Sequence, residues 1–349
     1  MISVSRVHAF LLKGAIAVII AMAANTVALS SAKADQPAKQ IFGAASLPAV
    51  LPARAVGFYS KGCLAGGVAI PTDGPTWQAM RLSRNRRWGH PDLVALVEQL
   101  SRDAAAADGW PGLLVGDIAQ PRGGPMLSGH ASHQVGLDAD IWLTPMPDRT
   151  LSAREREDIS ATSMLKKGTL YVDDAIWTPA HARLLMRAAS YPEVERIFIH
   201  PGIKKKLCDT WTGDRSAMGK LRPYYGHHYH FHIRIKCPPG VSGCKSQNPP
   251  PQGTGCDNSL AWWFTDEPWA PAKPAKKDDK PKPGKREIQL SDLPAACSAV
   301  VQAPGPASEA QVTFGSGATS GLAAVSGASA FAPVPLPARI PIPVPRPAN

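Results

Sequence analysis

Two short segments alternate apolar and polar side chains with a period of two, and this alternation constrains the fold more than any other feature of the sequence. In residues 137–143 the apolar side chains share one face of a predicted strand, while Asp138, Asp140 and Trp142 share the other. In residues 228–235 apolar residues, beginning with Tyr229, alternate in the same way with three histidines and Arg234. Each segment therefore predicts a strand that buries one face in the core and presents carboxylates or imidazoles on the other.

Histidines gather around these two segments. Six of the ten lie in two windows: His130, His133, His227, His228, His230 and His232. Because residues 128–130 read as a loop, His133 can fold back beside the strand that carries Asp140. Two histidines on one strand face stand roughly 6.5 to 7 Å apart, which suits one metal ligand and one neighbouring acid or base. Three protein ligands with water in the fourth place are typical of catalytic zinc, so the pattern predicts such a site.

Each of these residues also has an ordinary structural interpretation. A lone histidine is usually a satisfied surface or core group, and Asp138 or Asp140 alone could accept hydrogen bonds at a strand end. A single pair of histidines spaced by one residue is equally unspecific. The two strand patterns together, and the scarcity of histidine elsewhere, favour a metal site.

The N-terminus has the layout of a secretory signal peptide. Arg6 and Lys13 precede an apolar run, and small residues surround an expected cleavage site after Ala34. A membrane anchor is the alternative, but the run is short and interrupted, whereas a spanning helix needs ~20 apolar residues. The sequence therefore predicts an exported chain without stable membrane insertion.

All six cysteines follow that cleavage site, and an even number in an exported chain predicts three disulfides. Composition leaves their pairing open. The sequence has no Cys-x-x-Cys pair, which argues against a thiolate metal site. The formal charge of +11 falls to +8 without the signal peptide. For an exported protein this charge favours an acidic cell-wall polymer or membrane surface over nucleic acid.

The central part of the chain contains the predicted regular structure. Residues 92–107 carry apolar residues at helical spacing, and residues 112–118 predict a buried strand. A second helix is expected to begin at Thr178-Pro179, an N-cap followed by proline in the first turn. The sequence divides into a signal peptide (1–34), a flexible N-terminal segment (35–54), a catalytic domain (55–265), a Pro/Lys tether with a return segment (266–302) and a disordered Ala/Gly/Pro tail (303–349).

Several motifs closely resemble those of penicillin-insensitive murein endopeptidases, in the group that includes lysostaphin, D-alanyl-D-alanine metallopeptidases and hedgehog. The main ones are residues 128–133 (SGHASH), 136–140 (GLDAD) and 230–232 (HFH), which match a histidine, six residues, an aspartate and a later His-x-His. Further matching stretches are residues 80–81, 86–93, 116–117, 177–179 and 222–223. The similarity extends from about Gly57 to Cys297.

The resemblance implies a zinc ion (Zn²⁺) held by His133, Asp140 and His232, with His130 as a further metal-binding histidine. His230 and His227 would be the catalytic residues, which accept a proton or stabilise the oxyanion. His228 is expected to be structural or to face the substrate. Two additional metal ligands of the family correspond to Gly168 and Tyr171, which cannot ligate; Asp173 or Asp174 could substitute if the loop shifts.

The resemblance also implies the cysteine pairing, namely Cys63 with Cys297, Cys208 with Cys256, and Cys237 with Cys244. The expected fold is α+β, with a central antiparallel sheet, flanking helices and disulfide-tied loops. The implied reaction is hydrolysis of the amide between D-alanine and meso-diaminopimelate in cross-linked peptidoglycan, in the periplasm. Whether the chain forms a homodimer stays open.

Two alternatives remain. A zinc D,D-carboxypeptidase would use the same chemistry on free stem peptides, with an arginine such as Arg81, Arg86 or Arg87 for the terminal carboxylate. A non-catalytic wall-binding module is a different class, and the complete set of histidines and Asp140 argues against it. Release of monomers from cross-linked muropeptides, as opposed to release of D-alanine or binding alone, would distinguish these functions.

Overall fold

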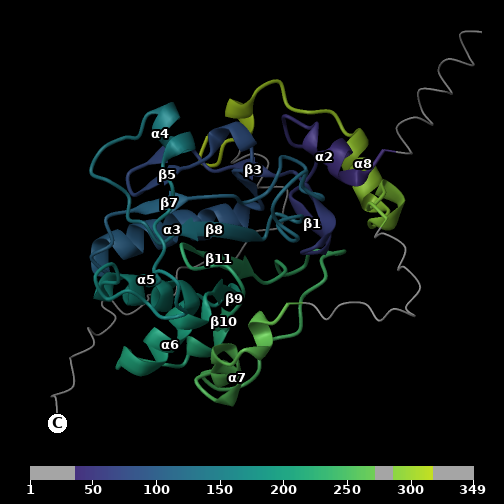
Figure 1. Cartoon of the computed structure of the whole chain (residues 1–349). Coiled ribbons are helices and arrows are strands. Elements are labelled where there is room, and N and C mark those ends of the chain that lie inside the picture. Colours follow the sequence, from purple (N-terminus) through teal and green to yellow (C-terminus); the bar gives the residue numbers. More distant parts are fainter. Residues whose placement is uncertain (1–35, 272–285, 317–349) are drawn as a thin grey trace, which may run out of the picture.

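The computed structural model describes residues 36–271 and 286–316 of the chain (Figure 1). The helices are α2 (Ala38–Gly43), α3 (Pro91–Ala107), α4 (Ala153–Asp158), α5 (Pro179–Ser190), α6 (Pro201–Thr210), α7 (Asn258–Ala261) and α8 (Ala296–Gln302). The strands are β1 (Arg54–Phe58), β2 (Lys61–Ala65), β3 (Val68–Ala69), β4 (Asp73–Gly74), β5 (Trp77–Ala79), β6 (Trp88–Gly89), β7 (Leu113–Val115), β8 (Asp138–Trp142), β9 (Val194–Ile199), β10 (Leu221–Pro223) and β11 (His230–Ile235). Short 3-10 turns are η1 (Leu82–Arg84), η2 (Met218–Lys220), η3 (Trp262–Phe264), η4 (Glu267–Trp269), η5 (Leu290–Asp292) and η6 (Glu309–Val312).

A seven-stranded sheet forms the centre of the protein, with strand order β10-β9-β11-β8-β7-β5-β4. The four central strands, β9, β11, β8 and β7, pair antiparallel, whereas β10 with β9 and β5 with β7 are parallel pairs nearer the edges. Two small sheets, β1-β2 and β3-β6, accompany it. The α+β class with an antiparallel centre is therefore confirmed, and the sheet as a whole is mixed.

The two segments with alternating residues become neighbouring strands at the middle of this sheet. In the antiparallel register of β8 and β11, His232 lies opposite Asp140 and Arg234 lies opposite Asp138. Directly opposed residues in an antiparallel pair project to the same side of the sheet. The period-two pattern thus places the carboxylates of one strand and the imidazoles of the other on one face.

The opposite face of β8 and β11 belongs to the main hydrophobic core. Ala139, Ile141, Phe231 and Ile233 are completely buried there, in one cluster with apolar residues of α3 and α5. Both helices begin where the sequence predicts, at a proline preceded by a capping residue. Tyr229 was expected in this core but is 38 % exposed, because β11 begins only at His230.

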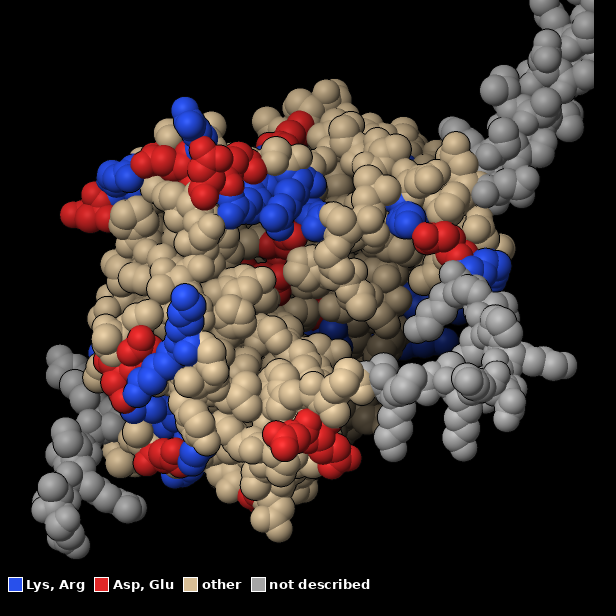
Figure 2. Space-filling model, viewed as in Figure 1, with Lys and Arg blue, Asp and Glu red and all other residues tan. Residues whose placement is uncertain are grey.

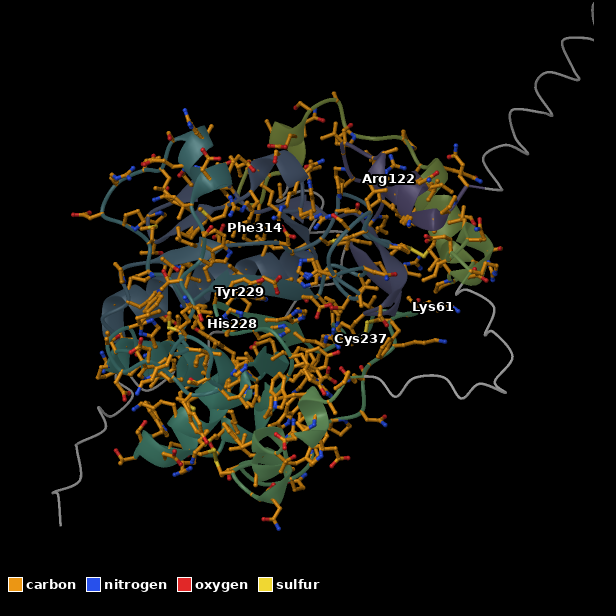
Figure 3. The ribbon with its side chains drawn as sticks, viewed as in Figure 1. Lys61, Arg122, His228, Tyr229, Cys237 and Phe314 are labelled. Atoms are coloured by element: carbon orange, nitrogen blue, oxygen red, sulfur yellow. A yellow bond between two sulfur atoms is a disulfide. The ribbon has the colours of Figure 1, made fainter. Side chains whose placement is uncertain are left out.

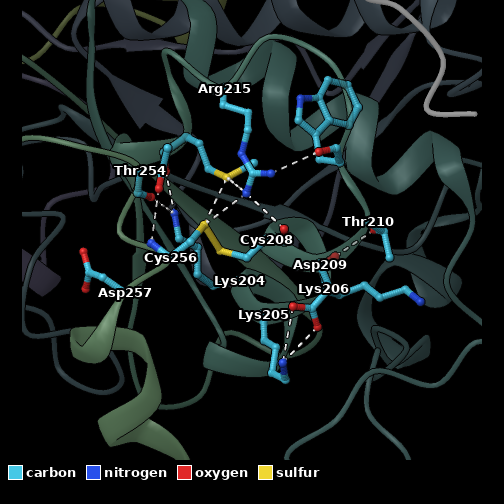
Figure 4. The surroundings of a disulfide bond; sticks show 12 residues. Lys204, Lys205, Lys206, Cys208, Asp209, Thr210, Arg215, Thr254, Cys256 and Asp257 are labelled. Atoms are coloured by element: carbon cyan, nitrogen blue, oxygen red, sulfur yellow. Dashed lines mark hydrogen bonds and ion pairs between the residues drawn. A yellow bond between two sulfur atoms is a disulfide. The ribbon is translucent and has the colours of Figure 1, made fainter. Parts of the chain in front are cut away.

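Three disulfides join the pairs that the family resemblance implies, Cys63–Cys297, Cys208–Cys256 and Cys237–Cys244. The first connects β2 to α8 across 234 residues of sequence. Around the second, shown in Figure 4, Arg215 donates a hydrogen bond to the Cys208 carbonyl and the ammonium of Lys204 donates one to the Thr254 carbonyl. The third closes a short loop directly after β11.

Two segments expected to lack structure pack on the domain instead. Residues 36–54 include α2, where Phe42 is completely buried against the core around the Cys63–Cys297 disulfide, so this part of the N-terminal segment is not a flexible arm. After Ala303, Val312 is 5 % exposed and packs with Trp88, while the amide of Phe314 donates a hydrogen bond to Ala69. In both segments a few isolated apolar side chains are buried, and their wide spacing gives no periodic pattern that would have predicted this packing.

The signal peptide, most of the Pro/Lys tether and the tail from residue 317 onward lie outside the described residues. The return segment is present as η5 and α8. Within residues 36–271 and 286–316, no helix has the length and apolar character that crossing a bilayer requires.

Candidate metal centre

His133 reaches the centre from the loop that precedes β8. Its backbone adopts a left-handed conformation, with φ of 65°, and its amide donates a hydrogen bond of 3.1 Å to Asp138 Oδ2. Non-glycine residues rarely adopt this conformation, and it persists only where the surroundings hold it. Gly136 follows at φ of 71°, where a Cβ atom would lie 2.9 Å from the His90 amide. The loop is thus bent so that His133 lies against the strand carrying Asp140.

Three potential ligand atoms converge at this point. His133 Nε2 lies 3.2 Å from His232 Nδ1 and 3.5 Å from Asp140 Oδ1, and His232 Nδ1 lies 3.2 Å from Asp140 Oδ1. Ligands at ~2.0–2.1 Å from a tetrahedral zinc ion are separated from one another by about 3.3 Å. The three atoms therefore form one face of a tetrahedron of the size that zinc requires.

Hydrogen bonds on the far sides of both rings determine which nitrogens face inward. His133 Nδ1 lies 2.5 Å from the Ile118 carbonyl, which can only accept, so this nitrogen carries the proton and Nε2 presents a lone pair. His232 Nε2 lies 2.8 Å from Asp138 Oδ1, which leaves its Nδ1 facing His133. Such outer hydrogen bonds orient metal-ligating histidines in proteins generally.

The centre fits a cation because its inward groups are all electron-rich. Asp140 Oδ1 is buried and has no hydrogen-bond partner among the described residues, and it faces the two ring nitrogens. Burial alone would raise the pKa of Asp140, but the neighbouring His133 and His230 hold it well below its usual range. A buried carboxylate beside two lone pairs is stabilised by a metal ion or by protons.

Asp138 supports both histidines at once. It accepts from the His133 amide, from His232 Nε2 and from Arg234 Nε, the last at 2.7 Å. Burial would raise the pKa of Asp138, yet Arg234 and His232 lower it far below the usual value. The Arg234 guanidinium lies 4.0 Å from the centroid of the Tyr59 ring, which holds it in place. Asp138 is therefore a charged anchor beneath the ligand atoms.

His130 lies at the edge of the same cluster. Its Nε2 is 3.0 Å from Asp117 Oδ2 and 3.5 Å from Asp140 Oδ2. His130, His133 and Asp140 each bring one potential ligand atom within 4.8 Å of the others. His130 has Asp117 as a nearer partner and is more exposed than His133, so it is held less closely to Asp140 Oδ1 than His133 is.

His230 and His227 border the cluster on the side of β11. His230 Nε2 lies 3.7 Å from Asp140 Oδ1, its Nδ1 is buried without a hydrogen-bond partner among the described residues, and its ring is 4.8 Å from that of His227. Burial lowers the pKa of His230, and burial followed by the charges of His230 and His232 lowers that of His227 to about 3. Both imidazoles therefore lie next to the three potential ligand atoms but are not among them.

Other residues considered from the sequence lie elsewhere. His228 Nδ1 is 2.9 Å from Ser163 Oγ, and Figure 3 shows His228 and Tyr229 side by side where the chain enters β11. Tyr171 is exposed and stacks on Phe264, and Asp174 pairs with Lys206. Asp173 accepts hydrogen bonds within its own turn. Among the described residues, none of these side chains contacts the cluster, so the structure gives no support to a substitute ligand.

A cleft of about 340 Å³ opens beside the ligand atoms. Asp140, His130 and His230 line it together with Arg81, Arg84, Asp117, Trp142 and Tyr229, among others. In Figure 2 basic side chains border a hollow at the level of β8, and acidic atoms are visible within it. A substrate in this cleft would have direct access to the cluster.

Comparison with known proteins identifies the family of this chain. The family model described as penicillin-insensitive murein endopeptidase matches residues 55–302. The chain belongs to this family. A protein of Haemophilus influenzae named penicillin-insensitive murein endopeptidase is 44 % identical over 227 residues, which are 65 % of this chain and 77 % of that protein. Its namesake in Yersinia enterocolitica is 38 % identical over 258 residues, or 74 % and 91 % of the two chains. As a member of a murein endopeptidase family, the chain is a peptidase, and its substrate is peptidoglycan.

The sequence interpretation did not single out three residues of this site as functional. Asp138 and Arg234 share a strand face with Asp140 and His232, so the period of two was a signal that could have identified them. Asp117 contacts His130, Arg84 and Arg86, and the sequence interpretation included it only within the matching stretch 116–117, without a role. The role of Asp117 depends on contacts between segments that are distant in sequence.

Proposed function

We propose that this protein is a zinc-dependent murein DD-endopeptidase that hydrolyses the amide between D-alanine and meso-diaminopimelate in peptidoglycan cross-links. The observation that carries the proposal is the triangle of His133 Nε2, His232 Nδ1 and Asp140 Oδ1, next to a cleft that Asp140 lines, in a murein endopeptidase family member. Its dimensions suit zinc, and its two imidazoles and one carboxylate are common zinc ligands.

In this proposal His133, Asp140 and His232 hold the ion, and His130 contributes a further imidazole at its edge. A bound zinc ion supplies an activated water near neutral pH and polarises the carbonyl of the amide. Asp138 keeps the ring of His232, and the Ile118 carbonyl keeps the ring of His133, in the tautomers that present lone pairs. The chain's own contribution is thus a preorganised set of donors that needs little rearrangement on binding.

His230 and His227 act on protons in this scheme. His230 Nε2 lies 3.7 Å from Asp140 Oδ1, and this position suits it to accept a proton from the attacking water. His227 donates from Nδ1 to the Tyr225 carbonyl at 2.7 Å, which leaves its Nε2 as a second proton acceptor next to His230. No serine takes part, so a β-lactam would find no hydroxyl to acylate.

The proposed compartment is the periplasm. Residues 1–34 have the pattern of a signal peptide, and three disulfides persist best in an oxidising compartment. Peptidoglycan, the substrate that belongs to this family, lies outside the cytoplasm.

The direct test is digestion of purified cross-linked muropeptide dimers by the zinc-loaded mature chain. We expect release of monomers, loss of activity and metal in His133→Ala, and loss of activity with metal retained in His230→Ala. His228→Ala is the matched control, since it changes a histidine beside the same strand outside the cluster. Release of free D-alanine without monomers would instead indicate a carboxypeptidase, and binding to sacculi without cleavage would indicate a wall-binding module.

A further inference from the structure

One wall of the cleft is a short turn that carries arginines. The turn η1 (Leu82–Arg84) lies between Arg81 and Asn85, which both adopt left-handed backbone conformations with φ of 55° and 51°. Two such residues on either side of a three-residue turn are unusual and must be stabilised by their surroundings. Backbone strain of this kind is often found where a side chain is held for function.

Contacts with three other segments hold this turn. Glu157 of α4 accepts hydrogen bonds from the Ser83 amide at 2.9 Å and from its hydroxyl at 2.8 Å. The Asn85 side chain donates to the Ser46 carbonyl and accepts from the Trp88 indole. Hydrogen bonds at Ser83 and Asn85 therefore hold the turn in place, and with it the backbone of Arg84.

The arginines of this region differ in how completely they are engaged. Arg81 donates to the carbonyls of Ile159 and Arg156 and lies over the Trp142 ring. Arg86 is 10 % exposed and is shared between Asp117 and Ser128. Arg87 pairs with Glu309 and donates to Ile70. The arginines suggested by the sequence for carboxylate binding are thus already bound within the protein.

Arg84 has capacity to spare. Its side chain is 48 % exposed, lines the cleft, and makes one hydrogen bond among the described residues, from Nη1 to Asp117 Oδ2 at 3.2 Å. A guanidinium has five N–H donors in a planar fork that matches a carboxylate. Asp117 Oδ2 also contacts His130, which in turn lies 3.5 Å from Asp140. The free donors of Arg84 are therefore near the reacting centre.

Charge in the cleft is consistent with an anionic ligand at this position. Asp117 is shared among Arg84, Arg86 and His130, so one carboxylate faces two permanent positive charges. These partners hold the pKa of Asp117 below its usual value although burial would raise it. Arg81 adds a third guanidinium to the same wall. Asp140, the other carboxylate that lines the cleft, faces the ring nitrogens of His133 and His232, so a carboxylate supplied by a ligand would balance the excess at this wall.

We propose that Arg84 binds a free carboxylate of the stem peptide beside the scissile amide, and so makes the enzyme selective for peptidoglycan in which that carboxylate is not amidated. The inference rests on the proposed endopeptidase function. In the cross-link, the carbon that bears the scissile nitrogen of diaminopimelate also bears a carboxylate. The D-glutamate residue of the stem supplies another, more distant one. Both candidates are carboxylates that a guanidinium can bind, and amidating one or the other shows which of them Arg84 recognises.

The test uses three purified dimers: unmodified, amidated at the diaminopimelate carboxylate next to the cross-link, and amidated at D-glutamate. The enzymes are the zinc-loaded wild type, Arg84→Gln, and Arg102→Gln as the matched control. Arg102 is 46 % exposed and pairs with one carboxylate, Glu98, but it lies on α3. The zinc content of each variant is measured first, because Arg84 contacts Asp117.

We expect amidation of diaminopimelate to lower kcat/KM of the wild type by roughly 10- to 100-fold, mainly through KM. Arg84→Gln should show the same loss on the unmodified dimer and no further loss on the amidated one. Arg84→Lys should recover part of the activity, since it keeps the charge without the fork. Sensitivity to D-glutamate amidation instead would assign the bound carboxylate to that residue. Equal sensitivity of wild type and Arg84→Gln to every amidation would overturn the proposal.

A binding measurement separates failure of this inference from failure of the proposed function. The probe is the tripeptide that ends in diaminopimelate. It is compared, in calorimetric titration of wild type and Arg84→Gln, with the same tripeptide amidated at the carboxylate next to the cross-linking nitrogen. If no dimer is cleaved, the endopeptidase proposal fails, while tighter binding of the free acid by the wild type alone still supports the role of Arg84. If both proteins bind acid and amide equally, Arg84 does not recognise the carboxylate.

Discussion

We call the buried layer beneath the cleft its floor; the floor and the wall of the cleft hold their side chains in opposite ways. On the floor, His133 and Asp138 are completely buried and each is fixed by hydrogen bonds to other segments. At the wall, Arg84 is half exposed and His230 keeps a nitrogen without a partner among the described residues. The difference suggests that the floor holds an ion in one geometry, while the wall keeps groups available for substrate and protons.

The largest effect is expected from removing the anchor of the floor. Asp138→Ala leaves Arg234 and the outer nitrogen of His232 buried without their partner, which should lower the free energy of unfolding by about 3–5 kcal/mol. Zinc affinity should fall by about 10- to 100-fold as well. Denaturant unfolding and metal titration measure these effects. Asp158→Ala, which removes an exposed carboxylate, should be nearly neutral, and equal stability of the two variants would contradict the anchor role.

The next effect concerns the wall. His230→Ala should lower kcat by about 10²- to 10⁴-fold, because a general base or acid typically contributes that much. Zinc content and the melting temperature should stay close to those of the wild type, since the ring makes no hydrogen bond through Nδ1. Steady-state kinetics and metal analysis check both. Loss of zinc in this variant would mean that His230 belongs to the floor, and the comparison would fail at that residue.

A smaller effect is expected from the loop that carries His133. Gly136→Ala should destabilise the protein by roughly 2–3 kcal/mol, since its φ is 71° and a Cβ atom would lie 2.7 Å from Leu64 Cδ2. Gly168→Ala is the control, with φ of 74° but nothing within 4 Å of the added atom. Thermal unfolding of the two variants separates strain alone from strain with steric clash. If they are equally stable, close packing does not hold this loop.

The last effect lies away from both regions, at Lys204, and is expected only in the pH dependence of stability. Its ammonium is buried and donates to the Met218 and Thr254 carbonyls, and burial lowers its pKa to about 7. Because the unfolded lysine titrates near its usual value of 10.5, the unfolded state binds more protons between these limits, and stability rises with pH by up to about 1.4 kcal/mol per unit.

Lys204→Met should remove this part of the pH dependence between pH 7 and 10, as followed by denaturant unfolding at several pH values. Lys205→Met, which changes an exposed neighbour paired with Asp209, should leave it intact. An unchanged pH profile in Lys204→Met would show that the folded lysine titrates normally. The metal centre should be unaffected in either variant.

Much of the fold's centre was predictable because it depends on local periodicity. The alternation around Asp140 and His232 is present in β8 and β11, α5 begins at the expected Pro179, and α3 begins one residue before the predicted range. The register of these two strands, which places His232 opposite Asp140, depends on tertiary contacts and was known only from the structure. The family resemblance supplied the disulfide pairing, which composition left open.

What sequence reasoning missed depends on contacts between distant segments. The left-handed backbone of His133 and its bond to Ile118 need the folded loop, and nothing in either residue's neighbours indicates them. The ordering of residues 36–54 follows from the burial of a few isolated apolar side chains such as Phe42. Arg84 became distinct from the neighbouring arginines only when their partners were known.

The most direct test of the central claim is anomalous diffraction at the zinc edge from crystals of the zinc-loaded protein. We predict a peak at ~2.0–2.2 Å from His133 Nε2, His232 Nδ1 and Asp140 Oδ1, and its absence from His133→Ala crystals grown in the same way. A peak bound by other residues, with these three atoms uncoordinated, would contradict the proposed metal centre.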